Sequence, residues 1–513
     1  MTYFEYDARP CGAGKTYDEF EQILQEPARY LLAVEKRERM DEVVPALEAA
    51  MARTELGSNR PEVLTIRSCA GTLTLASNGT LRQTGSRNVR QDVEALPTRF
   101  PAGSNVIVVV THEALRLADL RAFEHWHLRI DETPTAWDRQ TLAITVSRDI
   151  LVERYDLTQI TKSRSVITAR SDRAKESVSD IARDSIAQGI AVLHQRILSG
   201  RCRVTTDLAS WDELDIAKSF SWSSVWGLDN LFAFSSVRIL AHAFDQSVTY
   251  RIWCAQFPDI TWTDLGRTSP RRHARRKVLI HFFARRHEAS RSLWSSIEGQ
   301  MRLLQVAGYV SSGVSAGDHI WTCNKGDEPL LCAGRDKAAL PGQHLTPRQA
   351  GSNTYANRSS ATALLTCKPS RPDIAEAREL GIEPELIVDA REREVMVQFA
   401  TRTSVRDPQS TQTVRLYVYD WAQAEHLGKY FDATGYCMVE LVEVDLGFLN
   451  ASHDSRSGRK SSPRLTASQE EARGQRQREK TRERVRRHRK RKAAAGHPPD
   501  GDHGPVAKTP CGR

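Results

Sequence analysis

The spacing of apolar residues changes early in the chain. Residues 2–6 read TYFEY, an alternation typical of a short strand, whereas residues 17–25, YDEFEQILQ, carry apolar side chains at helical spacing. Residues 30–47 then predict a strand, a charged turn and an amphipathic helix. Strands and helices in alternation favour an α/β fold built on a parallel sheet.

Two further segments predict buried strands. Residues 105–115, NVIVVVTHEAL, form a nearly continuous β-branched run, which is typical of a strand covered on both faces of a parallel sheet. Residues 126–134, WHLRIDETP, predict a strand that ends in an acidic pair. Residues 136–226 are instead polar and helical in character, with the clearest helix predicted over 172–198. We therefore expect a helical insertion at 136–226.

The second half of the chain repeats the α/β pattern. Residues 231–247 predict a buried strand and a polar turn, after which a helix is expected over 292–308 and strands over 318–327 and 414–420. From residue 451 the hydrophobic pattern is lost and Ser, Gly, Gln, Arg and Pro dominate, which indicates disorder. The predicted organisation is two α/β domains and a disordered tail, at residues 1–247, 248–450 and 451–513.

Composition fits a soluble cytoplasmic protein. Of 513 residues, 40% are hydrophobic and 27% charged, and no apolar run approaches the roughly 18 residues of a membrane span. The first residues, MTYFEYDARP, lack the basic and apolar regions of a signal peptide. The nine cysteines are scattered and never in C-x-x-C, which indicates reduced thiols and argues against zinc.

The net charge of +9 belongs to the tail. From Ala451 onward 18 Lys and Arg stand against 7 Asp and Glu, so the tail carries +11 and residues 1–450 about −2. Within it, residues 479–496, EKTRERVRRHRKRKAAAG, offer positive charge without aromatic residues. Such a segment favours salt-sensitive, sequence-independent contact with a nucleic-acid backbone. The alternative is a solubilising tail.

Residues 8–16, ARPCGAGKT, predict a phosphate-binding loop between the first strand and the first helix. Gly12, Ala13 and Gly14 would present backbone N–H groups to a polyphosphate at the helix N-terminus. Lys15 would reach the β- and γ-phosphates of ATP, and the Thr16 hydroxyl would bind Mg²⁺. The alternative is a Gly-rich turn with an incidental lysine.

An acidic pair supplies the other half of such a site. Asp131 and Glu132 follow a predicted strand about 116 residues after Lys15. Asp131 would hold hydrated Mg²⁺, and Glu132 could orient and activate the attacking water. An exposed Asp-Glu turn is the alternative, but the pairing with Lys15 and Thr16 favours the catalytic interpretation.

In this order, ARPCGAGKT, VVTHEAL and LRIDETP resemble the motifs of superfamily 2 helicases of DEAD/DEAH-like type. The first follows the shorter form A-x-P-x-G-x-G-K-T, with Arg9 where the full pattern has Gly. The resemblance implies two RecA-like P-loop domains that hydrolyse ATP with Mg²⁺ and act on nucleic acid. It also implies that Glu35 and Lys36 lie near the nucleic acid. The basic cluster at residues 265–277 could contact phosphates by its charge, independently of sequence. Solvated loops are the alternative for both.

The later motifs of this family are matched loosely. Ala241, His242 and Ala243 stand where S/T-A-T is usual, so the hydroxyl groups of that coupling motif are missing. Gly351 and Asn353 match the Gly and Asp/Asn of motif V, which precede an apolar strand.

The family's arginine motif, Q-x-x-G-R-x-x-R, is approximated by Gln398, Arg402 and Arg406. Intervals of four predict one helix face, from which the two guanidinium groups could neutralise charge on the transferring phosphoryl group. Solvated surface arginines are the alternative.

The function implied is ATP-dependent translocation on, or unwinding of, nucleic acid, with DNA favoured over RNA. The loose later motifs point to replication of a phage- or plasmid-like element, including origin-binding types, with replication proteins as partners. A second hypothesis is a large-terminase-like packaging ATPase, which needs a nuclease with clustered carboxylates; Asp389, Glu392 and Glu394 form the nearby cluster and read as an exposed helix face. A third is a nucleic-acid-binding protein whose ATP site has decayed.

Overall fold

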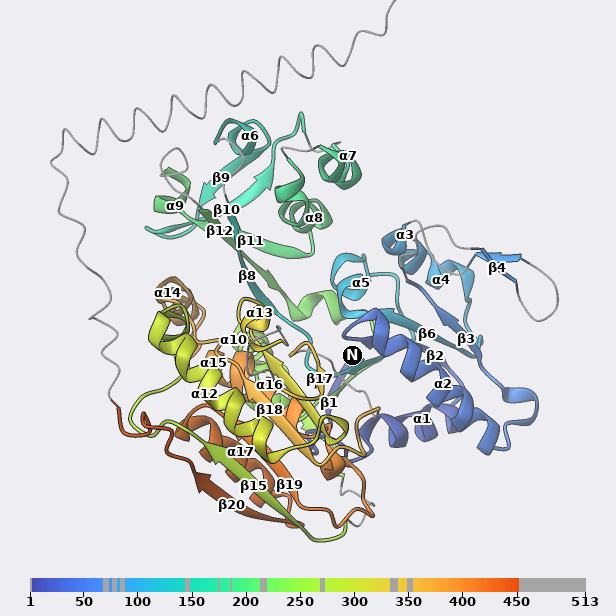
Figure 1. Cartoon of the computed structure of the whole chain (residues 1–513). Helices are drawn as coiled ribbons and strands as arrows, with labels where there is room; N and C mark the ends of the chain where they lie inside the picture. The colour runs from blue at the N-terminus through green and yellow to red at the C-terminus, as the bar shows by residue number, and fades with distance from the viewer. Residues whose placement is uncertain are drawn as a thin grey trace, which may run out of the picture. The chain divides into compact units, whose positions relative to one another are not determined.

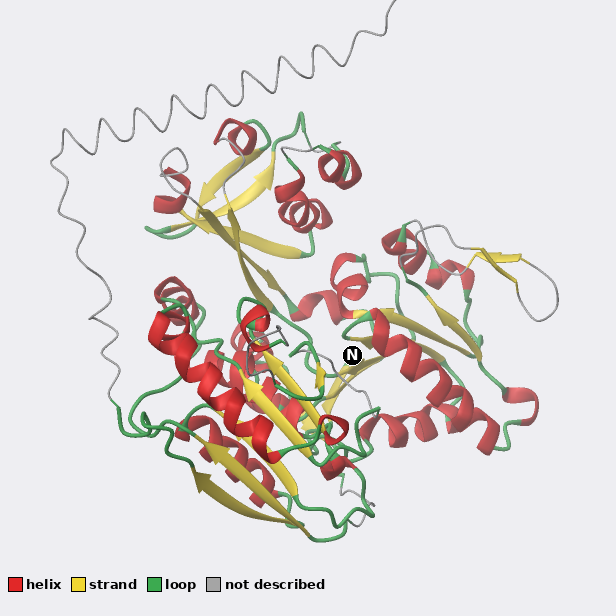
Figure 2. Ribbon diagram, in the orientation of Figure 1, coloured by secondary structure: helices red, strands yellow, loops and turns green. Residues whose placement is uncertain are grey.

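The structure is a computed structural model that describes residues 2–67, 73–75, 81–83, 88–143, 148–173, 176–184, 187–212, 219–267, 273–332, 340–347 and 354–451. These residues form two large parallel sheets with helices packed on them, and a third, five-stranded sheet (Figures 1 and 2). The two parallel sheets belong to one compact unit, and residues 140–194 and 205–222 belong to another. Among the described residues, no helix is long and apolar enough to cross a membrane.

The first parallel sheet has seven strands in the order β14-β1-β13-β7-β2-β6-β3. The strands, in chain order, are β1 (Tyr3–Tyr6), β2 (Arg29–Val34), β3 (Glu62–Thr65), β6 (Val106–Thr111), β7 (Trp126–Asp131), β13 (Ser236–Leu240) and β14 (Trp262–Asp264). The helices of this part are α1 (Lys15–Gln25), α2 (Arg37–Arg53), α3 (Val89–Glu94), α4 (Leu96–Arg99), α5 (His112–Leu117) and α10 (Val248–Gln256). A separate antiparallel pair joins β4 (Leu73–Leu75) and β5 (Leu81–Gln83).

The edge strand of this sheet corrects the expected boundary after residue 247. β14 pairs in parallel with β1, from Phe4 opposite Trp262 to Tyr6 opposite Asp264. Trp262 also stacks on Trp253 of α10, with ring centroids 6.0 Å apart. The first sheet therefore extends to residue 264, because aromatic packing and strand pairing hold this segment to β1.

Alternating side chains place helices on both faces of the first sheet. In β2, Leu32 and Val34 join the core cluster of α1 and α2, whereas Leu31 and Ala33 join the cluster that contains α5. Successive side chains of a strand point to opposite faces, so both faces of β2 are buried. The predicted buried strands at 105–115 and 126–134 are confirmed as β6 and β7 in the same sheet.

A buried ion cluster ties α1 to the sheet. The Glu19 carboxylate, which is fully buried, lies 2.5 Å from Nε of Arg129 on β7 and 2.8 Å from Nη1 of Arg238 on β13. Burial alone raises the pKa of Glu19, but the two guanidinium charges outweigh it and lower the pKa below its ordinary value. The cluster fixes the helix that carries Lys15 and Thr16.

Replacing Glu19 with Gln is expected to lower the free energy of unfolding by about 3–5 kcal/mol, because the buried Arg129 loses its carboxylate partner and Arg238 is left with Glu5. Since its pKa is lowered on folding, the contribution of Glu19 is full above the unfolded value of about 4.3 and is lost as the pH falls below it. Urea denaturation across this pH range measures both effects. The matched control is Glu21→Gln, on the exposed side of α1. A change in its free energy of unfolding beyond about 0.5 kcal/mol would contradict the role assigned to the buried ion cluster.

The second parallel sheet has the order β17-β16-β18-β19-β15-β20. Its strands are β15 (Arg276–Phe282), β16 (His319–Cys323), β17 (Gln343–His344), β18 (Ser360–Leu364), β19 (Val414–Val418) and β20 (Cys437–Glu443). Its helices are α11 (Arg291–Trp294), α12 (Ile297–Gly313), α13 (Glu328–Leu331), α14 (Arg371–Glu379), α15 (Pro384–Val388), α16 (Glu394–Ala400) and α17 (Trp421–Ala433). α12 packs in one core cluster, and α16 and α17 pack in another, so both faces are again covered. The expected helix stop at Gly308 is wrong, because α12 continues to Gly313.

The insertion at 136–226 is not the helical region that was expected. It contains a sheet of order β8-β12-β11-β10-β9, with strands β8 (Trp137–Ala143), β9 (Tyr155–Gln159), β10 (Arg164–Ala169), β11 (Cys202–Asp207) and β12 (Ser219–Trp226). Its helices are short: α6 (Arg148–Val152), α7 (Val178–Arg183), α8 (Ala191–Ser199) and α9 (Leu208–Asp212). The helix predicted over 172–198 is broken after α7 by Asp184, whose ψ is 114°. β10 pairs with its neighbour β9 and with the distant β11. The strands escaped prediction because their sequences are polar, and strand preference depends on packing against partners more than on the local residues.

Candidate active site

The glycine-rich loop runs from the end of β1 into α1, which confirms the expected strand, loop and helix. Gly12 and Gly14 have φ angles of +81° and +88°, a region that glycine adopts without strain. The Lys15 ammonium donates hydrogen bonds to the carbonyl oxygens of Arg9, at 2.7 Å, and Pro10, at 3.1 Å. The buried Ala13 donates its N–H to the same Pro10 carbonyl at 3.2 Å. The lysine is thus held across the mouth of the loop.

The first carboxylate of the acidic pair meets the end of this loop. The Thr16 hydroxyl donates to Oδ1 of Asp131 at 2.8 Å, and Nε of Arg39 donates to Oδ2 at 2.9 Å. Burial alone raises the pKa of Asp131, but Arg39, Thr16 and Lys15 lower it overall. Two residues 115 apart in sequence therefore form one oxygen-rich group, of the kind that holds Mg²⁺. Sequence reasoning missed Arg39, because one arginine in a charged helix turn gives no signal.

Glu132 adopts a backbone conformation that is unusual for its residue type. Its φ is +68°, and its N–H donates to the Leu240 carbonyl of β13 at 3.2 Å. A non-glycine residue in this region costs of order 1–3 kcal/mol and persists only where the surrounding structure holds it. Burial and the neighbouring Asp131 charge raise the pKa of Glu132. A strained carboxylate with a raised pKa is suited to accept a proton.

α16 places two polar residues beside this glutamate. Nε2 of Gln398 donates to Oε1 of Glu394 at 3.2 Å and lies 3.5 Å from Oε2 of Glu132. Burial, together with the charge of Glu132, raises the pKa of Glu394 to about 8. Glu394 was expected on an exposed helix face. It is instead part of the surroundings of Glu132, because α16 lies against the loop and the acidic pair.

The expectation that Gln398, Arg402 and Arg406 share one helix face is wrong. α16 ends at Ala400, and the Thr403 hydroxyl donates to the Ala400 carbonyl at 2.8 Å. Thr and Ser side chains compete for backbone groups in this way and favour helix ends. Arg402 follows the helix in a turn, and Arg406 ends a short 3₁₀ helix over Ser404–Arg406.

Arg406 nevertheless lies on the glycine-rich loop. A Cβ atom at Gly12 would lie 3.6 Å from Cγ and 3.8 Å from Nε of Arg406. These are ordinary van der Waals distances, so the Arg406 side chain lies directly against the loop at Gly12. Chain folding, not helical spacing, brings these residues together.

Arg402 is a buried cation with no hydrogen-bond partner for its terminal nitrogens within the described part of the chain. Its exposed fraction is 1%, and burial together with the Arg406 charge lowers its pKa to about 10. A buried charge needs a counter-charge or a ligand, and phosphate oxygens match a guanidinium fork. Together with the lysine and the backbone of the glycine-rich loop, this guanidinium supplies groups of the kind that fit a polyphosphate.

The segment in the place of the coupling motif also reaches the loop. Ala243, with φ of +46°, donates its N–H to the Ala8 carbonyl at 3.4 Å. The ring of His242 lies 5.1 Å from the ring of Tyr430, whose hydroxyl accepts the Cys11 N–H at 3.2 Å. Burial and the Lys15 charge lower the pKa of His242 to about 4, so this ring is neutral. The segment joins the loop to α17 through His242 and the Ala243 backbone.

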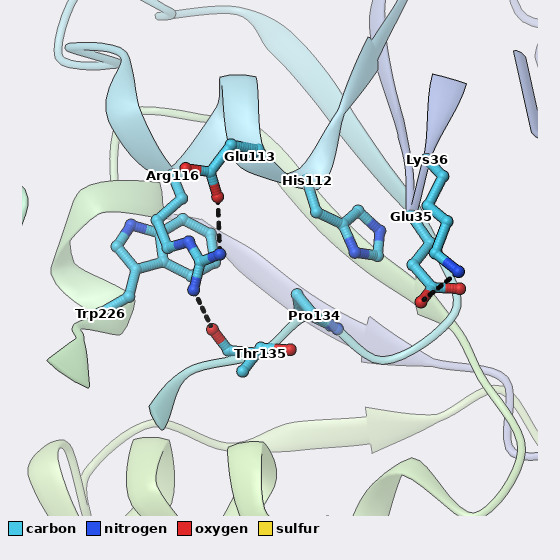
Figure 3. Close-up of a pocket in the computed structure, with 8 residues that line it drawn as sticks. All are labelled: Glu35, Lys36, His112, Glu113, Arg116, Pro134, Thr135 and Trp226. Atoms are coloured by element: carbon cyan, nitrogen blue, oxygen red, sulfur yellow. Dashed lines mark hydrogen bonds and ion pairs between the residues drawn. The ribbon is translucent and has the colours of Figure 1, made fainter. Parts of the chain in front are cut away.

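A pocket of about 180 Å³ opens at the carboxyl ends of β2, β6 and β7 (Figure 3). Arg116 spans it, bonded to Glu113 at 2.7 Å and to the Thr135 carbonyl at 3.2 Å. Nε2 of His112 lies 3.0 Å from the Asp131 carbonyl, and burial lowers the pKa of His112 to about 4. The remaining lining residues are Glu35, Lys36, Pro134 and Trp226. Thr111 directly precedes His112 in the chain and caps α5, where its hydroxyl accepts the Ala114 N–H.

Gly351 and Asn353 of the expected motif V, and the basic segment 479–496, lie outside the described residues, as does 268–272 of the cluster at 265–277. The carboxylates of the nuclease hypothesis are placed, and Glu392 is buried, accepting the Cys367 N–H and the Gln423 amide at 2.8 Å each. Within the described ranges, no three His, Cys, Asp or Glu residues gather as a metal site.

The arrangement is thus two parallel sheets with helices on both faces, a glycine-rich loop after β1 and an Asp-Glu pair at the end of β7. No protein-family model matches the sequence, and no curated protein matches it. Solved structures that resemble it include an XPD helicase (8% identity, 86% of this chain and 96% of that one, TM-score 0.46). A second is a variant of S. cerevisiae Dbp5 bound to RNA and ADP BeF3, with 10% identity, a TM-score of 0.34, and 86% of this chain and 85% of that one covered. A third is a DEAD box protein from Methanococcus jannaschii, with 9% identity, a TM-score of 0.24, and 86% of this chain and 88% of that one covered. At this identity the likenesses assign no residue a role.

Proposed function

We propose that this protein is an ATP-dependent nucleic-acid translocase or helicase that acts in DNA replication of a phage- or plasmid-like element. The observation that carries the catalytic part is the hydrogen bond between Thr16 and Asp131, beside a P-loop lysine. These residues come from two elements and meet where a nucleotide-binding fold needs a metal site. The basic segment 479–496 is proposed as a contact to the phosphate backbone, with DNA favoured over RNA.

Each residue has a proposed part in hydrolysis. Backbone N–H groups of Gly12 and Gly14, and that of Ala13 in exchange for its bond to the Pro10 carbonyl, bind phosphate oxygens, and Lys15 neutralises their charge. Thr16 and Asp131 hold Mg²⁺, which when bound offsets charge on the β- and γ-phosphates. Glu132 takes a proton from the attacking water, and Gln398 orients that carboxylate. Arg402 and Arg406 stabilise the charge that develops on the phosphoryl group, and Gly351 and Asn353 are proposed to line the same site.

The test is phosphate release from ATP with single-stranded DNA, single-stranded RNA, duplex DNA or no polymer. We expect single-stranded DNA to raise the rate at least about tenfold, with a strong salt dependence, since backbone contacts release counter-ions. Lys15→Ala should abolish turnover in every condition, because the phosphates lose their principal counter-charge. Turnover by the intact protein that no polymer changes would contradict the motor proposal.

The two rival hypotheses receive less support. A packaging ATPase needs a two-metal nuclease, and the buried, hydrogen-bonded Glu392 does not serve as an open ligand. A decayed ATP site is disfavoured by the retained Lys15, Thr16 and Asp131 contacts. Mg²⁺-dependent cleavage of plain DNA would favour the first, and nucleic-acid binding without any turnover would favour the second.

A further inference from the structure

Asp131 has a specific partner on each carboxylate oxygen. Thr16 bonds to Oδ1, and the guanidinium of Arg39 bonds to Oδ2 at 2.9 Å. The side chains of Asp131 and Arg39 are 3% and 16% exposed, so water screens this ion pair weakly. One positive charge of the protein already offsets the carboxylate expected to hold a divalent cation.

Arg39 is shared between two acidic groups. It lies in the first turn of α2, and its Nη1 also bonds to Oε2 of Glu42 at 2.9 Å, one turn along the same helix. The Glu42 side chain is 36% exposed and attracts the guanidinium toward the surface of the protein. The buried Asp131 carboxylate attracts the same guanidinium toward the glycine-rich loop. The position of the arginine charge therefore depends on the balance between Asp131 and Glu42.

We propose that Arg39 is a positioning residue that holds Asp131 by one oxygen and competes with Mg²⁺ for that carboxylate, thereby setting the Mg²⁺ concentration that nucleotide binding requires. The inference rests on the proposed function, since it assumes a nucleotide bound with Mg²⁺. Two cations beside one buried carboxylate repel each other, because weak screening leaves their interaction strong. Glu42 lessens the competition by offsetting part of the arginine charge.

The test measures binding of a fluorescent ADP analogue over a range of Mg²⁺ concentrations at constant ionic strength. Arg39→Gln is expected to lower the half-saturating Mg²⁺ concentration about tenfold, because the competing charge is gone. Glu42→Gln is expected to raise it about threefold, because Asp131 then has the whole arginine charge. Opposite shifts from two neighbouring residues are not expected from a general loss of structure.

A melting curve without nucleotide gives an independent readout. Arg39→Gln should lower the melting temperature, because Asp131 stays buried without its ionic partner, whereas saturating Mg²⁺ and ADP should raise it by more than in the unaltered protein. The control is Arg37→Gln, which removes the same charge from an exposed position in the same helix turn. It should leave the Mg²⁺ requirement unchanged.

The outcomes separate this inference from the proposed function. If the unaltered protein binds the ADP analogue and Lys15→Ala does not, but Arg39→Gln leaves the Mg²⁺ requirement unchanged or raises it, the inference fails alone. If Arg39→Gln does not fold, the Glu42→Gln variant provides the test. A half-saturating Mg²⁺ concentration that is unchanged or lower in Glu42→Gln overturns the inference. If the unaltered protein binds no nucleotide at any Mg²⁺ concentration, both proposals fail.

Discussion

Replacing Glu132 with Gln is expected to lower the rate of ATP hydrolysis about 10³-fold while nucleotide binding is kept. A positioned general base contributes about 10²–10⁴-fold, and the amide keeps the shape of the side chain but cannot accept the proton. The raised pKa and the strained backbone of Glu132 both fit this role. Single-turnover phosphate release measures the chemical step, and a fluorescent nucleotide measures binding.

The control for this variant is Glu38→Gln, which removes an exposed carboxylate in the first turn of α2. It should change neither rate nor binding. If Glu132→Gln hydrolysed ATP at the unaltered rate, the attacking water would have to be activated by another group. Glu394, whose side chain shares Gln398 with Glu132, would then be the next candidate.

Replacing Arg402 with Met is expected to raise stability and abolish most activity. The terminal nitrogens of Arg402 have no hydrogen-bond partner among the described residues, and an apolar side chain of similar length removes that unpaired buried charge. The free energy of unfolding without nucleotide should rise by about 1–3 kcal/mol. Hydrolysis should fall about 10³-fold, because the guanidinium is expected to meet the phosphoryl charge.

Chemical denaturation without nucleotide and phosphate release measure the two effects. The matched control is Arg415→Met, at an exposed position of β19, where both quantities should change little. A loss of stability in Arg402→Met would indicate that the arginine has a structural partner. Unchanged hydrolysis would remove Arg402 from the proposed mechanism.

Local sequence patterns were enough for the features that depend on neighbouring residues. The buried strand β6 follows from its β-branched run, and the loop of Gly12 and Gly14 follows from residue types that adopt positive φ. The end of β7 at Asp131 could also be predicted from the sequence, since a strand and its end depend on neighbouring residues. These segments were sufficient to predict an α/β fold with a P-loop.

Which distant groups meet depends on tertiary packing. Arg39 bonds to Asp131, Glu394 shares Gln398 with Glu132, and Arg406 packs on Gly12, although no spacing in the sequence relates these residues. The strands of the insertion were missed because their polar sequences show little strand preference by themselves, and β10 is stabilised by pairing with β9 and with the distant β11. Helical periodicity gave the wrong geometry after Ala400, where hydroxyl side chains bond to the backbone and end the helix. Local pattern fixes elements, whereas packing between elements decides the contacts of the site.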